Sequence, residues 1–328
     1  MFVPETYSLA LFLMIVCMTC WGSWANTVKL AGNVRFELFY WDYAAGVFLM
    51  AVILAFTAGS WYGGEEAFLN NLSAATGPRV AVAMLAGTIF NLANILLVGA
   101  IAIAGMAIAF PIAIGAALVI GTVLTYIVDQ SGNGAMLFAG VGLAVVAVIA
   151  DGLAYKELSD DGAKAGKKGL SIAIISGVLM GSWSPLTAAS MSESAFAGAP
   201  LTPYTSTVLF TFATLVSTFF FNIYFMQRPL VGEPVSFEGY LKGKPSWHAL
   251  ALAGGFIWTI GTASNLIAGR EAGFAVSYAM GQSAPMVAAL WGVLVWREFK
   301  GASSKAKTYL ALMFVFYASA IAVIANAF

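Results

Sequence analysis

Apolar segments of about twenty residues recur along this chain of 328 residues, and they limit its fold more than any other feature. A helix of about 20 residues crosses the hydrocarbon core of a bilayer. Charged residues make up 9% of the chain, against roughly 25% in soluble domains, so a water-soluble globular fold is excluded. The segments are apolar on every face and do not alternate, which argues against a membrane β-barrel. The sequence therefore predicts an all-α membrane protein.

Ten such segments can be placed, and charged residues, prolines and glycines gather between them. The predicted spans are Tyr7–Thr27, Phe39–Gly59, Val80–Gly99, Met106–Val128, Ala135–Tyr155, Leu170–Ser190, Tyr204–Met226, Trp247–Ala268, Phe274–Trp296 and Lys307–Ala327. The linkers between them are too short to fold as separate domains.

Two parts of the chain resemble each other. Gly87–Asp129 aligns without gaps on Gly255–Arg297, and WGSW from Trp21 is echoed by MGSW from Met180. Chance similarity is the alternative, because glycine, alanine and valine are common in any membrane helix. The length of the aligned segment favours a true repeat.

We therefore predict two five-helix repeats, at 1–155 and 170–328, joined by a cytoplasmic connecting loop at 156–169. Because five is odd, the second repeat enters the membrane from the opposite side. This inverted repeat is the architecture of many secondary transporters, in which the substrate site lies near the middle of the membrane between the repeats.

Positive charges are distributed unequally between the two sides of the predicted bundle. Thirteen lysines and arginines lie in the loops that follow the odd-numbered spans, and the remaining loops hold only Arg79 and Arg270. Cytoplasmic loops carry an excess of such residues. The pattern predicts a plasma (inner) membrane protein with both termini outside the cytoplasm. The net charge of zero gives no indication of a nucleic-acid partner.

Tryptophan, tyrosine and amide side chains share faces of several predicted spans. An amide inside a membrane finds its hydrogen-bond partner either on a neighbouring helix or in a wet cavity, and for each single residue both alternatives stay open. Their gathering on spans that correspond across the repeat favours a shared cavity. Indoles stack on flat rings and amides donate and accept hydrogen bonds, so the expected solute is small, neutral and polar. The candidate substrate-binding residues are Trp21, Trp24, Asn91, Asn94, Trp183, Trp258, Thr262, Asn265, Tyr278 and Gln282.

The charged residues in or beside the spans lie near predicted span ends, where an interfacial position is the simplest interpretation. Asp42 is the best exception, because it lies among aromatic residues in FYWDY. A carboxylate in such a setting can take up a proton near neutral pH, which makes Asp42 the candidate for proton coupling. Asp129, Asp151, Lys29 and Arg297 are read as interfacial.

Two prolines lie inside paired spans of the predicted repeat. Pro111 is in the fourth span and Pro285 is in the ninth. Proline removes an intrahelical hydrogen bond and kinks a helix. Both residues are candidate hinges, with a purely structural kink as the equal alternative.

Enzyme and cofactor motifs are missing from the sequence. It contains neither HExxH nor GxSxG, and GAKAGKKG at Gly162–Gly169 departs from the phosphate loop in its spacing and final residue. Cys17 and Cys20 lie in the first span, where two small residues on one helix face are a simpler interpretation than a metal site. We expect no enzyme activity, no cofactor and no metal.

Four segments carry a resemblance to a known family: Trp41–Ser60, Gly87–Asp129, Asn222–Gly243 and Ala272–Leu310. On these residues the chain resembles the ureide permease family of the drug/metabolite transporter superfamily. The glucose/rhamnose-type sugar permeases of that superfamily are similar around Gly105–Gly121 and Gly273–Trp296.

The resemblance implies the drug/metabolite transporter fold of ten helices in two inverted repeats. It also implies alternating access, often proton-coupled, and a cavity built by helices 1 to 4 and 6 to 9, with helices 5 and 10 peripheral. Plant ureide permeases carry allantoin and nucleobases and have a long central loop with a phosphate-loop-like motif. Here the loop is short and lacks that motif, so the substrate carries over less firmly than the fold.

The sequence thus predicts a secondary active transporter for a small neutral polar solute of the ureide or nucleobase kind, coupled to a proton or ion. One alternative is a sugar permease of the glucose/rhamnose type. A second, from another class, is a membrane scaffold or receptor that transports nothing. The expected partners are the solute, the coupling ion and the lipid bilayer, and the expected assembly is a monomer or homodimer.

Overall fold

The computed structural model describes residues 1–158 and 166–328, and within these ranges the regular structure is helical, without strands. Residues 159–165 lie in the middle of the predicted connecting loop, outside the described part. The elements are α1 (Tyr7–Ser23), α2 (Asn26–Ala31), α3 (Phe36–Phe56), α4 (Phe68–Ala74), α5 (Gly77–Ala104), α6 (Met106–Val128), α7 (Gly134–Lys156), α8 (Lys167–Met191), α9 (Pro203–Gln227), α10 (Phe237–Leu241), α11 (Pro245–Ala272), α12 (Phe274–Gly281), α13 (Ala284–Leu290), the π-helix η1 (Trp291–Val295) and α14 (Ser304–Ala325).

The prediction of ten membrane spans is confirmed, since the described residues contain 10 helices that are long and apolar enough to cross a bilayer. The first span joins α1 and α2, and the ninth joins α12, α13 and η1. The third and eighth spans, α5 and α11, begin earlier than predicted because each has a proline in its first turn, where a helix tolerates it. The protein is an integral multi-pass membrane protein.

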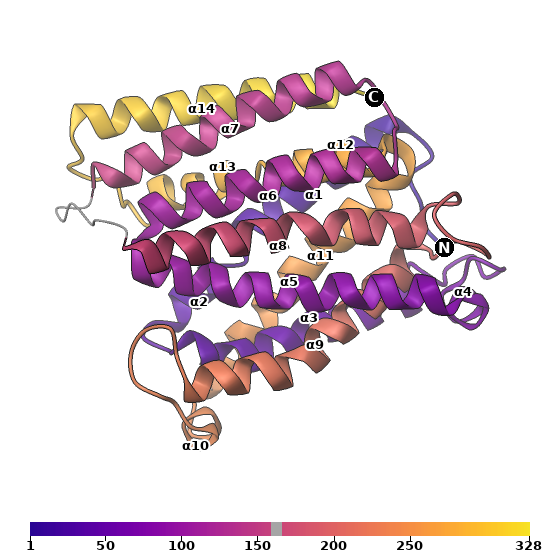
Figure 1. The fold of residues 1–328 in the computed structure, drawn as a ribbon, viewed down its shortest axis with the longest axis horizontal. Helices are drawn as coiled ribbons and strands as arrows, with labels where there is room; N and C mark the ends of the chain where they lie inside the picture. The colour runs from indigo at the N-terminus through magenta and orange to yellow at the C-terminus, as the bar shows by residue number, and fades with distance from the viewer. Residues whose placement is uncertain (159–165) are drawn as a thin grey trace.

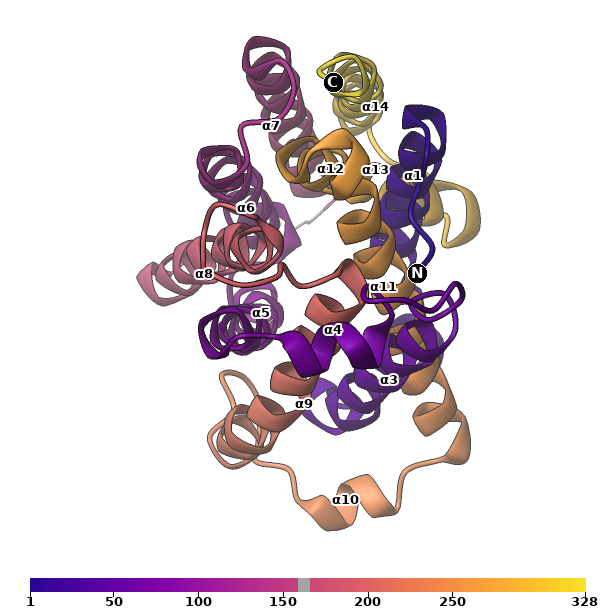
Figure 2. The same ribbon diagram turned by 90° about the vertical axis from the view of Figure 1, so that its right-hand side faces the viewer.

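The helices run side by side in one bundle, with α7 and α14 packed together at one edge and α3 and α9 at the other (Figures 1 and 2). Between these edges, α8 packs on α5 and α6, and α1 packs on α11 and α13. Both chain termini lie at one end of the bundle, while α2 and α10 lie at the opposite end (Figure 1). The end that holds α2 also holds the loops predicted to be cytoplasmic.

Two glycines connect long helices without an intervening loop. Gly105 separates α5 from α6 with φ 78°, and Gly273 separates α11 from α12 with φ 81°. Glycine adopts this left-handed backbone at little cost, and other residues do so rarely. The two glycines occupy equivalent positions in the aligned segments of the sequence.

A second equivalent pair of glycines marks close helix contacts. A Cβ atom added to Gly87 of α5 would lie 1.9 Å from the carbonyl oxygen of Phe210 in α9. One added to Gly255 of α11 would lie 2.3 Å from the carbonyl oxygen of Tyr43 in α3. The two contacts involve corresponding helices of the two halves, as a repeat requires. They support the predicted repeat, whose inverted symmetry and boundaries stay a prediction.

Large apolar side chains cover the outer surface of the bundle. Phe220 is 70% exposed, Leu294 is 69% exposed and Ile127 is 63% exposed. In water such a surface would be unfavourable, and in a bilayer it faces lipid tails.

Arg79, in the first turn of α5, is fully buried and holds the loop between α8 and α9. Its guanidinium donates to the carbonyl oxygens of Ser190 at 3.0 Å, Ser192 at 2.7 Å and Gly198 at 3.1 Å, and also to that of Phe196. Its positive charge thus compensates several carbonyl dipoles at the end where both termini lie.

We expect Arg79→Met to destabilise the protein by about 3 kcal/mol, because it leaves several buried carbonyl groups without a donor. Thermal unfolding of the detergent-purified protein, followed by size-exclusion chromatography, measures the change. Arg79→Lys keeps the charge but loses the planar guanidinium, so its melting temperature should lie between those of the wild type and Arg79→Met. A wild-type melting temperature for Arg79→Met would contradict the anchoring role.

Candidate functional site

A cavity of about 570 Å³ opens inside the bundle. Such a volume is typical of sites that bind small molecules, which hold roughly 300–1,000 Å³. Residues from α1, α2, α3, α5, α6, α7, α8, α11, α13 and η1 line it, together with Gln282 in the break after α12 and with Glu298 in the loop after η1. Both halves of the chain therefore build the cavity.

Four rings form the deep end of the cavity, and we refer to Trp21, Phe90, Trp183 and Trp258 as the aromatic floor. Trp258 stacks on Phe90 with ring centroids 4.5 Å apart and on Trp21 at 6.4 Å. Trp183 meets Trp21 edge-on at 6.0 Å. Indole faces of this kind give a flat solute an apolar surface on which to stack.

Two amides complete the polar part of the cavity. Asn94 of α5 lines it and is held in place by donating to the Tyr40 hydroxyl at 3.2 Å. Gln282 lines it from the break between α12 and α13, where the helix is interrupted by two turn residues. Broken helices of this kind are where transporters place their binding sites.

Pro285 lies directly after this break, in the first turn of α13, and also lines the cavity. The proline nitrogen carries no hydrogen and cannot donate a backbone hydrogen bond. A proline at this position therefore favours the end of one helix and the start of the next. Pro111 lies within the continuous helix α6, and its ring packs so closely that a Cβ on Gly152 of α7 would come within 2.3 Å of it. The hinge role stays a prediction for both prolines, and the break gives it more support at Pro285.

The structure places six predicted binding residues on the cavity lining: Trp21, Trp24, Asn94, Trp183, Trp258 and Gln282. The other four, Asn91, Thr262, Asn265 and Tyr278, are buried outside it. Thr262 supports the floor by accepting from the Trp21 indole nitrogen at 3.0 Å. The Tyr278 hydroxyl donates to the Ala117 carbonyl at 3.1 Å and joins α12 to α6.

The two buried amides are also used in contacts between helices. Asn91 accepts from the Tyr40 hydroxyl at 2.8 Å and donates to Ser217 at 2.7 Å. Asn265 donates to the Ser277 carbonyl at 2.7 Å, and the Ser277 hydroxyl donates back to the Asn265 carbonyl at 2.7 Å. Both asparagines thus form hydrogen bonds between helices, which is one of the two alternatives that the sequence left open.

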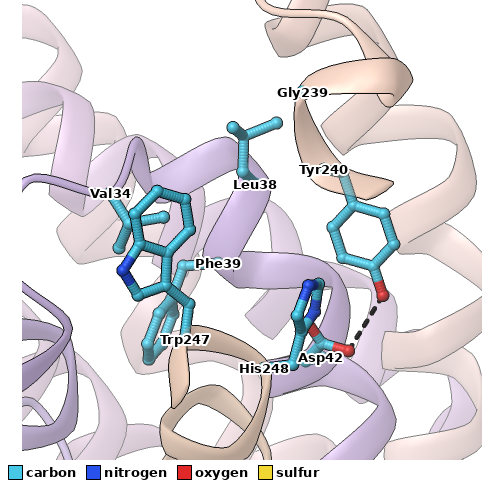
Figure 3. Close-up of a pocket in the computed structure, with 8 residues that line it drawn as sticks. All are labelled: Val34, Leu38, Phe39, Asp42, Gly239, Tyr240, Trp247 and His248. Carbon is cyan, nitrogen blue, oxygen red and sulfur yellow. Dashed lines mark hydrogen bonds and ion pairs between the residues drawn. The ribbon is translucent and has the colours of Figure 1, made fainter. Parts of the chain in front are cut away.

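Asp42 lies outside the large cavity, beside a small cleft between α3, α10 and α11 (Figure 3). Its carboxylate accepts from the Tyr240 hydroxyl at 2.9 Å and lies 2.7 Å from Nδ1 of His248, the only histidine of the chain. The contacts hold α10 against the ends of two spans. The coupling role of Asp42 stays a prediction, and its position gives that role no direct link to the solute.

Tyr240, outside the spans, has its pKa raised to about 12 by burial, by its hydrogen bond to Asp42 and by the negative charge of Asp42. The phenol therefore keeps its proton through the neutral range. It remains a donor to Asp42 whenever Asp42 is ionised.

Three charged residues and one tyrosine, which line the cavity toward its entrance, were not among the predicted site residues. We call Lys29, Asp151, Tyr155 and Glu298 the mouth cluster, and all four line the cavity. Lys29 forms an ion pair with Glu298, and the Tyr155 hydroxyl donates to the other oxygen of Glu298 at 3.0 Å. The side chains of Lys29 and Glu298 are 44% and 29% exposed, so the cavity opens at this end.

The mouth cluster changes the expected role of the fifth span. The family resemblance implied that helix 5 is peripheral, and α7 does lie at the edge of the bundle (Figure 2). Its last turns nevertheless contribute Asp151 and Tyr155 to the cavity. Asp151 is only 4% exposed and lines the cavity, so it is not the interfacial residue that was expected.

A family model described as ureide permease matches residues 39–168 and 164–327. The chain belongs to the ureide permease family. Ureide permease 1 of Arabidopsis thaliana is 26% identical over 387 aligned residues, which cover 99% of this chain and 98% of that protein. Probable ureide permease A3 of Vigna unguiculata is 25% identical over 369 residues, covering 92% and 96%. The family resemblance seen in the sequence is thereby confirmed.

The fold is shared with a protein of known structure. A solved crystal structure that is 16% identical superposes with a TM-score of 0.68, over 96% of this chain and 97% of its own. At this identity the likeness concerns the fold alone. Family membership, the ten spans and the cavity describe a membrane transporter.

Proposed function

We propose that this ureide permease family member is a secondary active transporter that carries a small neutral polar solute of the ureide or nucleobase kind across the plasma membrane. The observation that carries the proposal is the aromatic floor with Asn94 and Gln282 beside it. The rings offer a stacking surface, and the amides offer donors and acceptors matched to a ureide or a nucleobase. The names of the relatives point to the same class of solute.

Alternating access fits a cavity that reaches one end of the bundle and stops at a packed floor. Behind the floor, Asn265, Thr262 and Tyr278 are buried and hydrogen-bonded, while the exposed members of the mouth cluster lie at the opposite end of the cavity. That end carries the lysine-rich loops, so we assign it to the cytoplasm and the termini to the other side. The conformation is then open to the inside, and a rearrangement of the two predicted repeats would expose the floor to the outside. Coupling to protons would supply the driving force.

Tryptophan fluorescence of the purified protein tests the solute class. We expect allantoin or uracil to quench the emission saturably, because either ring can stack on Trp21 and Trp258. Trp258→Phe should remove most of the change, while Trp61→Phe should keep it, since Trp61 is 74% exposed and far from the lining residues in sequence. Quenching by rhamnose alone would support the sugar permease. Absence of quenching by all three would contradict the proposed solute class and favour the scaffold.

A further inference from the structure

Asp151 is a buried carboxyl group with no balancing charge of its own. It is 4% exposed, it lines the cavity, and its Oδ1 atom is buried without a hydrogen-bond partner. In the part of the chain that the structure describes, no lysine or arginine forms an ion pair with it. An ionised carboxylate in such a position is costly, and a proton removes that cost.

The nearby cation is already engaged by the other carboxylate. Lys29, from α2, pairs with Glu298, and the Lys29 ammonium lies 4.5 Å from the centre of the Trp296 ring. Glu298 interacts electrostatically with Asp151. Two ionised carboxylates on the lining of one cavity repel each other, and protonation of one relieves the repulsion.

The other titratable groups on the helices packed against α7 are tyrosines and, in the first turn of α14, Lys305 and Lys307, of which Lys305 pairs with Glu157 at 2.8 Å. Tyr317, on α14, interacts electrostatically with Asp151. The helices α6 and α12, which also pack on α7, contain no charged residue, and each has one tyrosine. Of these, Tyr126 lies against Gly134, and Tyr278 donates to the Ala117 carbonyl. No second base competes for the proton from these two helices.

Two polar side chains, Tyr155 and Glu298, line the cavity together with Asp151. Tyr155 follows Asp151 by one helical turn on the same face of α7, and its hydroxyl donates to Glu298 at 3.0 Å. Glu298 is 29% exposed and therefore meets water. Exposure thus rises from the buried Asp151 to the accessible Glu298, as a route for a proton requires.

The backbone around Glu298 is built to hold this geometry. Arg297 has φ 55°, the one non-glycine residue with positive φ in the described ranges, and it directly follows the π-helix and Trp296. A Cβ on Gly292 of the π-helix would lie 2.8 Å from Oε2 of Glu298 and 3.4 Å from the Tyr155 hydroxyl. Strained residues and π-helices gather at functional sites. Here they place Glu298 against Tyr155.

We propose that Asp151 is the proton-binding carboxyl group of the transport cycle, and that Tyr155 and Glu298 connect it to the mouth of the cavity. The inference rests on the proposed proton-coupled transport. A proton binds an oxygen of Asp151 while the cavity faces the outside, and it leaves from the same oxygen toward the mouth when the cavity opens to the cytoplasm. The solute and the proton then share one cavity, which is the physical basis for their coupling.

Proteoliposomes given external radiolabelled allantoin, and preloaded with unlabelled allantoin for the counterflow assay, test the assignment through Asp151→Asn. At one proton per solute, a one-unit pH difference should concentrate allantoin about tenfold in wild-type vesicles. The variant should give no gradient-driven accumulation, yet keep solute counterflow within roughly twofold, since counterflow needs no net proton movement. Asp42→Asn is the matched control and should accumulate allantoin like the wild type. Accumulation by Asp151→Asn, or loss of accumulation in Asp42→Asn, would overturn the assignment.

A second measurement is independent of transport. Infrared spectra recorded through the neutral pH range should contain the C=O band of a protonated carboxyl group that is missing from Asp151→Asn and present in Asp42→Asn. The same band in wild type and Asp151→Asn would overturn the assignment, whatever the vesicles show. If the wild-type protein catalysed counterflow but did not accumulate allantoin in response to a pH difference, that result would instead contradict the proposed coupling. The two failures are therefore distinguishable.

Discussion

Replacing Gly87 or Gly255 by alanine is expected to destabilise the protein by about 3 kcal/mol, at the upper end of the cost of overpacking a core. The added methyl group would lie 1.9 Å or 2.3 Å from a backbone carbonyl oxygen of the facing helix. A backbone atom cannot rotate away as a side chain can. The helix pairs α5–α9 and α11–α3 must therefore separate along their contact.

The matched control is Gly142→Ala in α7, where an added Cβ meets nothing within 4 Å. That substitution should leave the melting temperature unchanged or raise it slightly, because alanine favours a helix by about 1 kcal/mol over glycine. Thermal unfolding in detergent of the three variants measures the contrast. Equal melting temperatures for Gly87→Ala and Gly142→Ala would contradict the close contact of α5 and α9.

Periodicity and composition were enough to predict the spans, because a bilayer imposes one length and one polarity on every crossing helix. From the sequence, Gly87 and Gly255 could be recognised only as equivalent positions in the aligned segments. Their tight contacts depend on which helix lies opposite, and that is a property of the packed bundle. The glycine pair Gly105 and Gly273 could be aligned too, but its positive φ became visible only in the structure.

The candidate site was predicted in part. Tryptophans in membrane spans are large and must pack somewhere, and Trp21, Trp183 and Trp258 do meet in one floor. The positions of the amides were harder to predict. The spacing of residues shows which face of a helix they share, but it does not show what that face packs against. Asn91 and Asn94 share a face of α5, yet only Asn94 lines the cavity.

Asp151 was missed for a related reason. Its place near the end of a span indicated an interfacial residue, which is the usual case. Whether water reaches such a residue depends on how far the neighbouring helices extend past it. Helix α7 continues to Lys156, and the Asp151 carboxyl group faces the interior cavity, where it is buried.

Substitution of Gln282 by leucine is expected to lower allantoin uptake at least tenfold, because in the proposed function Gln282, at the break between α12 and α13, forms hydrogen bonds with the solute. A lost hydrogen bond of about 1.5 kcal/mol corresponds to roughly a tenfold weaker interaction. Leucine is of similar size and apolar, so the fold should tolerate it. The variant should therefore reach the membrane in normal amounts and melt like the wild type, and uptake into expressing cells measures its function.

Asn265→Leu is the contrasting variant, and the comparison separates binding from packing. Asn265 lies behind the aromatic floor and its side-chain amide donates to the Ser277 backbone carbonyl, so loss of this bond should lower the melting temperature rather than act on the solute directly. The expected pattern is low uptake with normal stability for Gln282→Leu and reduced stability for Asn265→Leu. Wild-type uptake by Gln282→Leu would remove this amide from the binding site. Normal stability with abolished uptake in Asn265→Leu would place the solute deeper than the floor, in contact with the amide that the sequence first suggested.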